Sequence, residues 1–215
     1  MIFNFALIIF LYFLIIVSGK LLYDKGVSNL QVRNISKFFA YIITIYMHKV
    51  LNFDLAILIC IFFTIILLIS KKYKALPSIF EYKEEKNIAP ILLPLGIILL
   101  ALTFWNFKPY IFEISCLVMA FSDVISKTLG QKIGNIKLGD TGKTLEGSII
   151  FLINTVILYL FMFGVYKIGI SYLYLVKILT SSLILTFVQS AFNSDWDNLP
   201  LPFLTGLVSV WVFYG

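Results

Sequence analysis

Long apolar blocks constrain this chain more than any other feature of its sequence. Apolar residues make up 60% of the 215 residues and charged residues only 13%, about half the usual share in a soluble domain. A transmembrane helix needs about 20 predominantly apolar residues, and the blocks leave room for seven or eight helices with short loops. Composition therefore excludes a soluble domain and a disordered chain, and it predicts a polytopic membrane protein.

Charged residues, prolines and glycines divide the chain into eight candidate helices. We expect an all-α transmembrane helix bundle forming one integral membrane domain over residues 1–215. It would have about eight spans, or seven if the second and shortest block does not cross. The first block follows Met1 without a basic segment or a small-residue cleavage site, which predicts a retained helix. The expected helices cover residues 2–19, 38–50, 54–71, 89–106, 109–126, 146–166, 171–192 and 199–214.

Positive charge alternates between the loops. Thirteen of the 17 lysine and arginine residues lie in the odd-numbered loops and three in the even-numbered loops. The positive-inside rule then predicts odd loops in the cytoplasm and both termini outside. The net charge of +6 follows from this topology, so nucleic acid is not an expected partner. Most acidic residues lie on the same side, where a soluble phosphorylated cosubstrate could meet a lipid.

Asp123 is the first candidate functional residue. It lies among Phe121, Val124 and Ile125, close to the expected cytoplasmic end of the fifth helix. Acidic residues in or near the membrane are candidates for function. The alternative is a solvated helix terminus.

A glycine-containing loop follows Asp123 and leads into the sixth helix. Glycines let backbone N–H groups approach an anion. A lysine, a hydroxyl and a helix N-terminus come next, an order typical of phosphate binding. The loop is not a Walker P-loop, because Lys137 stands where that pattern needs glycine and no strand precedes it. Alternatively, Thr144 and Glu146 only cap the helix. The glycines and the lysine are Gly130, Gly134, Gly139, Gly142 and Lys143.

A second polar stretch precedes the last helix. Asp195 and Asp197 flank Trp196, and Asn198 follows. Two carboxylates and an amide can hold Mg²⁺, which prefers oxygen ligands and usually also binds substrate phosphates. The alternative is a polar turn closed by a proline.

The remaining candidates are few. Arg33 and Lys37 lie four residues apart and share a helix face, so they either bind phosphate groups or anchor the chain at lipid headgroups. His48 is the only histidine and falls on the expected outer side, which weakens functions that need a catalytic histidine. Cys60 and Cys116 lie in apolar runs without metal-ligand spacing.

Together these motifs resemble the membrane polyprenol kinases, namely the dolichol kinases and phytol kinases. That group belongs to a CTP-transferase superfamily that includes the phosphatidate cytidylyltransferases. The family pattern is an Asp at a helix end, two Gly four residues apart, a Lys-Thr/Ser-x-Glu-Gly-Ser/Thr segment and a later Asp-Asn-Leu motif. In this chain, within a catalytic half at about 110–215, the corresponding residues are Asp123, Gly130, Gly134, Lys143, Thr144, Glu146, Gly147, Ser148, Asp197 and Asn198.

The resemblance implies transfer of the γ-phosphate of CTP to the hydroxyl of a long-chain isoprenoid alcohol at the cytoplasmic membrane face. It implies that Asp123 and Asp197 bind Mg²⁺ or another divalent cation, or that one of them accepts the alcohol proton. Lys143 and the helix start that follows it would hold the CTP phosphates. Asn198 would bind metal or nucleotide, and Arg33 would join the nucleotide site. Grooves between helices would accept the prenyl chain.

The chain departs from the family pattern at several positions. Gly142 stands where a second Lys is common, and Gln189 stands where an acid is usual. Many relatives carry an Arg-Lys-x-x-His motif near the N-terminus, and here Asn34 replaces its Lys and Lys37 replaces its His. Two alternatives therefore stay open. One is a cytidylyltransferase that makes a CDP-lipid, although its late signature is missing. The other is a non-catalytic lipid-binding or transport relative. The sequence fixes neither the alcohol nor the oligomeric state, and an oligomer is compatible with it.

Overall fold

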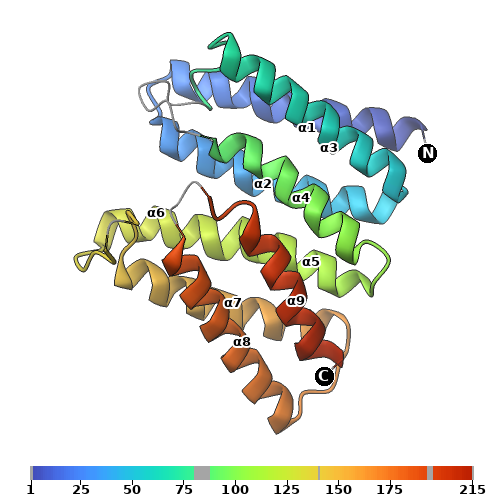
Figure 1. Cartoon of the computed structure of the whole chain (residues 1–215), viewed down its shortest axis with the longest axis vertical. Helices are drawn as coiled ribbons and strands as arrows, with labels where there is room; N and C mark the ends of the chain where they lie inside the picture. Colours follow the sequence, from blue (N-terminus) through green and yellow to red (C-terminus); the bar gives the residue numbers. More distant parts are fainter. Residues whose placement is uncertain (1, 80–87, 140, 193–195, 215) are drawn as a thin grey trace.

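The computed structural model describes residues 2–79, 88–139, 141–192 and 196–214. These residues form an all-helical protein with one isolated antiparallel bridge between Lys137 and Thr144. Figure 1 shows the helices packed side by side in a bundle. In chain order they are α1 (Ile2–Asp24), α2 (Asn29–Val50), α3 (Phe53–Lys72), α4 (Ala89–Phe104), α5 (Pro109–Leu117), η1 (Val118–Asp123), α6 (Val124–Ile133), α7 (Leu145–Val165), α8 (Tyr172–Ala191) and α9 (Pro200–Tyr214).

Five helices are long and apolar enough to cross a membrane. They are α1, α3, α7, α8 and the continuous helix 109–133, which comprises α5, η1 and α6. The helices α4 and α9 are apolar but shorter. The expected helical bundle is confirmed, and its apolar helices are compatible with a membrane protein. The number of spans stays a prediction.

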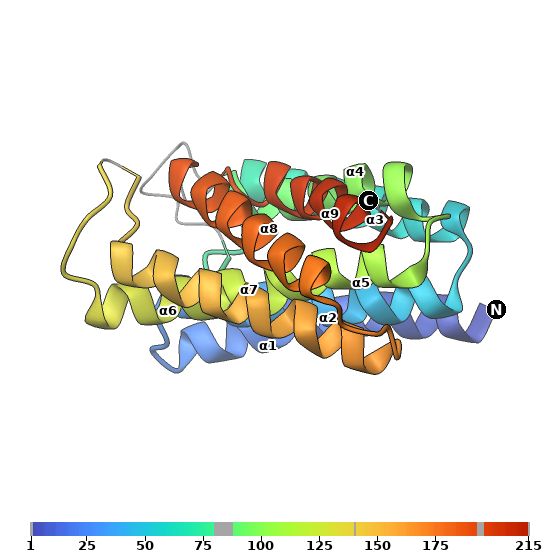
Figure 2. The same cartoon turned by 90° about the horizontal axis from the view of Figure 1, so that it is seen from below.

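The helix ends alternate between two ends of the bundle (Figure 2). The loops that follow α1 and α6 lie at one end. The loops that follow α2, α4 and α7 lie at the opposite end, together with both chain termini. The odd-numbered loops that the structure describes therefore share one end, as the charge alternation requires.

Three helices extend well beyond their expected ends. The first ends at Asp24 and not at residue 19. The second begins at Asn29 and not at residue 38, and Ser28 caps it by accepting a hydrogen bond from the Gln31 backbone N–H. The fifth continues past residue 126 to Ile133. Several charged and polar residues in the extensions of the second and fifth helices do not end them, because their side chains find partners inside the bundle. Asn34, for example, donates to Thr128 across 3.2 Å.

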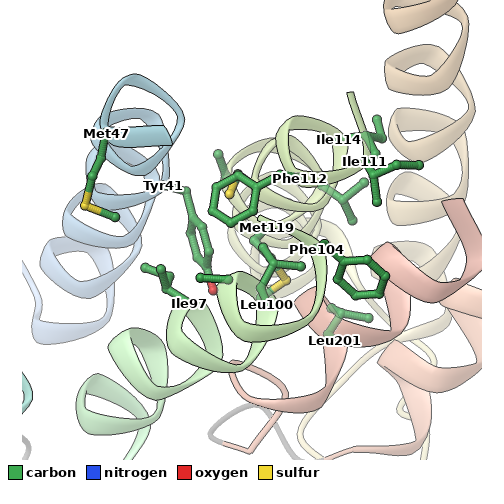
Figure 3. Close-up of a cluster of buried hydrophobic side chains, with 14 of the residues drawn as sticks. Tyr41, Met47, Ile97, Leu100, Phe104, Ile111, Phe112, Ile114, Met119 and Leu201 are labelled. Carbon is green, nitrogen blue, oxygen red and sulfur yellow. The ribbon is translucent and has the colours of Figure 1, made fainter. Parts of the chain in front are cut away.

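The hydrophobic core joins the helices that carry the candidate site. Tyr41 from α2, Phe104 from α4 and Phe112 from α5 are buried in it beside Met119 of η1 (Figure 3). Burial of large apolar and aromatic side chains fixes these helices relative to one another, so that polar groups along them meet in a defined geometry.

Helix α9 depends on a glycine for its approach to α4. A Cβ atom at Gly206 would lie 2.5 Å from Cε2 of the buried Phe104 ring. We expect Gly206→Ala to destabilise the fold by about 1–3 kcal/mol through overpacking. Gly164→Ala is the matched control, since no described atom lies within 4 Å of a Cβ there, and it should stabilise α7 by about 0.5–1 kcal/mol. Thermal unfolding in detergent measures both; a shift of the same sign for the two variants would contradict the packing.

Candidate functional site

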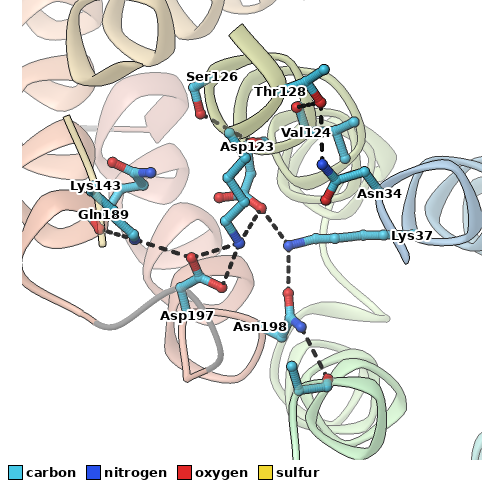
Figure 4. A network of polar contacts seen from close by, with 12 residues as sticks. Asn34, Lys37, Asp123, Val124, Ser126, Thr128, Lys143, Gln189, Asp197 and Asn198 are labelled. Atoms are coloured by element: carbon cyan, nitrogen blue, oxygen red, sulfur yellow. Dashed lines mark hydrogen bonds and ion pairs between the residues drawn. The ribbon is translucent and has the colours of Figure 1, made fainter. Parts of the chain in front are cut away.

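Five charged side chains meet in the interior of the bundle, and we call them the lysine–aspartate cluster (Figure 4). They come from α2, η1, α6 and the segments that precede α7 and α9. Both carboxylates are fully buried, and the three lysine side chains are between 5% and 11% exposed. The members are Lys37, Asp123, Lys127, Lys143 and Asp197.

Each aspartate of the cluster contacts two lysines. The Lys127 ammonium lies 2.9 Å from Oδ2 of Asp123 and 2.9 Å from Oδ2 of Asp197, so it bridges the two carboxylates. Lys37 completes the Asp123 contacts and also donates to Oδ1 of Asn198. Lys143 lies 3.1 Å from Oδ2 of Asp197. Buried charges persist when they are paired and hydrogen-bonded in this way.

Asp123 is an interior residue of the helix 109–133. It ends the π-helical segment Val118–Asp123 and is fully buried. The alternative of a solvated helix terminus is therefore wrong. Local π-helical geometry is frequent at functional sites. The i,i+4 spacing of Asp123 and Lys127 puts both on one helix face.

Two side chains of the segment before α9 point into the bundle and contact the cluster lysines. Asp197 is fully buried and Asn198 is 6% exposed, so their side chains do more than close a polar turn. Asn198 donates to the Ala89 carbonyl of α4 at 3.0 Å. Gly96 lets this segment approach, because a Cβ there would lie 2.2 Å from the Asn198 carbonyl oxygen. Asp195 lies outside the described residues.

The glycines of the phosphate-like motif bring α6 close to the start of α7. A Cβ at Gly130 would lie 3.1 Å from Cα of Gly147, and one at Gly134 would lie 2.4 Å from Oγ1 of Thr144. Thr144 caps α7 by accepting a hydrogen bond from the Gly147 backbone N–H at 3.2 Å. These contacts support packing and capping roles for the four residues.

The other motif residues shape the loop between α6 and α7. Glu146 is half-buried and accepts a hydrogen bond from the Asn135 backbone N–H at 2.9 Å. The Ser148 hydroxyl donates to the Thr144 carbonyl. Gly139 and Gly142 have φ angles of +54° and +72°, which favour glycine. Among the described residues, the hydrogen bonds of the Glu146 and Ser148 side chains therefore go to backbone groups and not to the lysine–aspartate cluster.

Two cavities meet at the cluster. The first, the apolar groove, comprises about 920 Å³ of space between α1, α2, α3 and α4, part of it open to the surroundings. Apolar side chains form most of its wall, and Lys37, Lys127 and Asn198 form a polar end. The apolar lining includes Tyr12, Ile16, Ala40, Ile59, Cys60, Phe63, Leu67, Leu93 and Ile97.

The second cavity, the polar pocket, comprises about 580 Å³ of space beside α6 and the start of α7, part of it open to the surroundings. Its wall includes Lys143, Thr144, Gly130 and Gln189. Three residues line both cavities, and they are Arg33, Asn34 and Lys127. A molecule in the apolar groove and one in the polar pocket could therefore both reach Lys127.

The carboxylate pair does not fit the expected divalent metal in this arrangement. Lys127 already lies between Asp123 and Asp197, where a bridging cation would bind. Among the described residues, which omit Asp140 and Asp195, no group of three or more Asp, Glu, His or Cys side chains is placed to hold a metal. Three ammonium groups would also repel an added dication.

Sequence reasoning did not single out Lys127 and did not connect Lys37 to the carboxylates. It treated Lys127 only as a basic loop residue and Lys37 as a headgroup anchor or phosphate contact. The i,i+4 spacing from Asp123 to Lys127 was the available signal. Lys143 was singled out from its motif. Burial lowers the pKa of this lysine below its ordinary value, while nearby Asp197 opposes that shift.

Comparison of the chain with protein-family models, curated proteins and solved structures finds no match.

Proposed function

We propose that the protein is a lipid kinase that transfers the γ-phosphate of CTP to the hydroxyl of a long-chain isoprenoid alcohol at the cytoplasmic membrane face. The observation that carries the proposal is the meeting of an apolar groove and a polar pocket at Lys127. One cavity suits an apolar chain and the other suits an anion. The motif order along the sequence favours the same reaction.

The polar pocket is suited to the triphosphate. Lys127, Lys143 and Arg33 contribute positive side chains to its wall. Hydrogen bonds between ammonium or guanidinium groups and phosphate are charge-assisted and strong. Phosphoryl transfer depends mainly on positioning and on neutralising charge at the transferred group, and these cations can supply both. The choice of CTP over ATP comes from the family resemblance alone.

The apolar groove is suited to the alcohol. Its apolar walls would bury the chain, and its polar end at Lys37 and Asn198 would hold the hydroxyl. Oδ1 of Asp123 is buried and has no hydrogen-bond partner among the described residues. We assign this oxygen as acceptor of the hydroxyl proton. The alcohol oxygen then bonds to the γ-phosphorus, the bond from that phosphorus to the bridging oxygen breaks, and CDP leaves.

A labelling assay with purified protein in nanodiscs tests the reaction. One arm supplies γ-³²P-CTP or γ-³²P-ATP with isoprenoid alcohols of graded length. The parallel arm supplies α-³²P-CTP with phosphatidate. Label in the alcohol from the γ position supports the kinase and identifies its substrates. Label in the phospholipid from the α position would instead assign a cytidylyltransferase. Label in neither product would overturn the proposal.

The cytoplasmic location of the site is a separate prediction. Both native cysteines, Cys60 and Cys116, are buried, so single added cysteines can report sidedness. We expect Lys137→Cys, exposed near the site, to react with an impermeant maleimide only after the cells are opened. Lys108→Cys, exposed in the loop after α4, should react from outside. The reverse pattern would contradict this topology.

A further inference from the structure

We propose that Lys127 takes the place of a protein-bound divalent metal, so that the lysine–aspartate cluster binds nucleotide phosphates without a metal between its two carboxylates. The identity of the anion as a nucleotide phosphate rests on the proposed function. The absence of a bridging metal rests on the geometry of the cluster.

The position of the Lys127 ammonium is the first argument. It lies 2.9 Å from one oxygen of each aspartate and 3.0 Å from Oδ1 of Asp197. Mg²⁺ binds carboxylate oxygens at about 2.0–2.1 Å and requires near-octahedral geometry. A metal bridging Asp123 and Asp197 would have to displace this ammonium. The lysine already supplies the positive charge that a bridging metal would bring.

The charge of the cluster is the second argument. Counted over the described residues, the three lysines and two aspartates give the cluster a net charge of +1 when all are ionised. A dication would raise that charge to +3 in a site where the carboxylates are fully buried. A phosphate anion would lower it. Like charges repel strongly in a poorly solvated interior, so the cluster favours the anion.

The fixed orientation of the lysines is the third argument. Lys37 is held by Asp123 and Asn198, and Asn198 is itself held by the Ala89 carbonyl. Lys143 is held by Asp197 and by the backbone carbonyl of Gln189. The aspartates thus serve to position cations in the walls of the two cavities. Preorganised cations bind an anion at a lower entropic cost than mobile ones.

Two binding measurements on the full-length protein test the inference. The first is calorimetry with inorganic pyrophosphate in EDTA, and we expect binding. The second is an electron paramagnetic resonance titration with Mn²⁺ alone, and we expect no site involving the two aspartates. A pyrophosphate affinity that appears only with Mg²⁺ would overturn the inference. So would Mn²⁺ binding that Asp197→Asn removes.

Substitution of the bridging lysine sharpens the test. We expect Lys127→Met to weaken pyrophosphate binding at least about tenfold and to create a Mn²⁺ site between the aspartates. Lys132→Met, at an exposed position of α6, is the matched control and should change neither result. Unchanged pyrophosphate affinity in a folded Lys127→Met protein would contradict the inference. The wild-type measurements stand alone if that variant does not fold.

Failure of this inference is distinguishable from failure of the proposed function. Metal-free pyrophosphate binding without any phosphate transfer would remove the kinase assignment and leave the anion site. Transfer accompanied by Mn²⁺ binding at the aspartate pair would leave the kinase and remove the role of Lys127.

Discussion

Asp123→Asn is expected to lower the rate of phosphate transfer by at least about 100-fold, the scale observed when one group that stabilises transition-state charge is removed. The amide has the size of the carboxylate, but it lacks the negative charge that holds Lys37 and Lys127. It is also a far weaker proton acceptor than the carboxylate. The measurement is initial rate with γ-labelled CTP at saturating alcohol.

Two further variants complete this test. Lys143→Ala removes a cation from the wall of the polar pocket and should lower transfer to a comparable extent. Asp54→Asn is the control, because Asp54 is exposed in the first turn of α3. Membrane insertion should be unchanged in all three proteins. Transfer retained in both Asp123→Asn and Lys143→Ala would refute the site assignment.

The sequence predicted the gathering of the motif residues better than their individual roles. Asp123, Lys143, Asp197 and Asn198 were singled out from separate segments, and the structure brings them into one contact network. Lys37 escaped a precise assignment because its contact with Asp123 spans 86 residues. Such a contact depends on how α2 packs on η1, and local sequence patterns do not determine that packing.

Helix ends were mispredicted for a related reason. Charged residues near residue 33 and beyond residue 126 were taken as loop, since charge on an apolar helix is usually costly in a membrane. Internal pairing offsets that cost, and the helices continue. The glycines at 130 and 134 suggested an anion loop, which stays a prediction, and the structure adds that both approach Thr144 closely.

One departure from the kinase family pattern leaves the cluster intact. Gln189 stands where an acid is usual, yet the contact it makes to Lys143 uses its backbone carbonyl. Any residue at that position can supply the same acceptor. The Gln189 side chain instead belongs to the wall of the polar pocket, where its Oε1 has no partner among the described residues. The substitution therefore changes the pocket and not the positioning of Lys143.

The depth of the apolar groove should limit the length of the alcohol. The groove follows α4 from Ala89 to Ile97, about 12 Å at 1.5 Å per residue. Cys60 of α3 forms part of the groove wall. It lies in the first half of α3, far from the polar end of the groove. We expect Cys60→Trp to fill the deep part of the groove. Long-chain alcohols should then show at least a tenfold higher KM, while short-chain alcohols change by less than about threefold.

The neighbouring residue supplies a control for this prediction. Ile61 is exposed on α3 and does not line the groove, so Ile61→Trp adds the same bulk outside it. Rates measured across alcohols of graded length separate the two variants, because a general loss of stability would lower every rate equally. A length-dependent loss in Cys60→Trp alone would place the prenyl chain between α3 and α4. Equal loss for short and long alcohols in a Cys60→Trp protein of unchanged thermal stability would mean that the chain binds elsewhere, since bulk in the deep part of its own groove must discriminate by length.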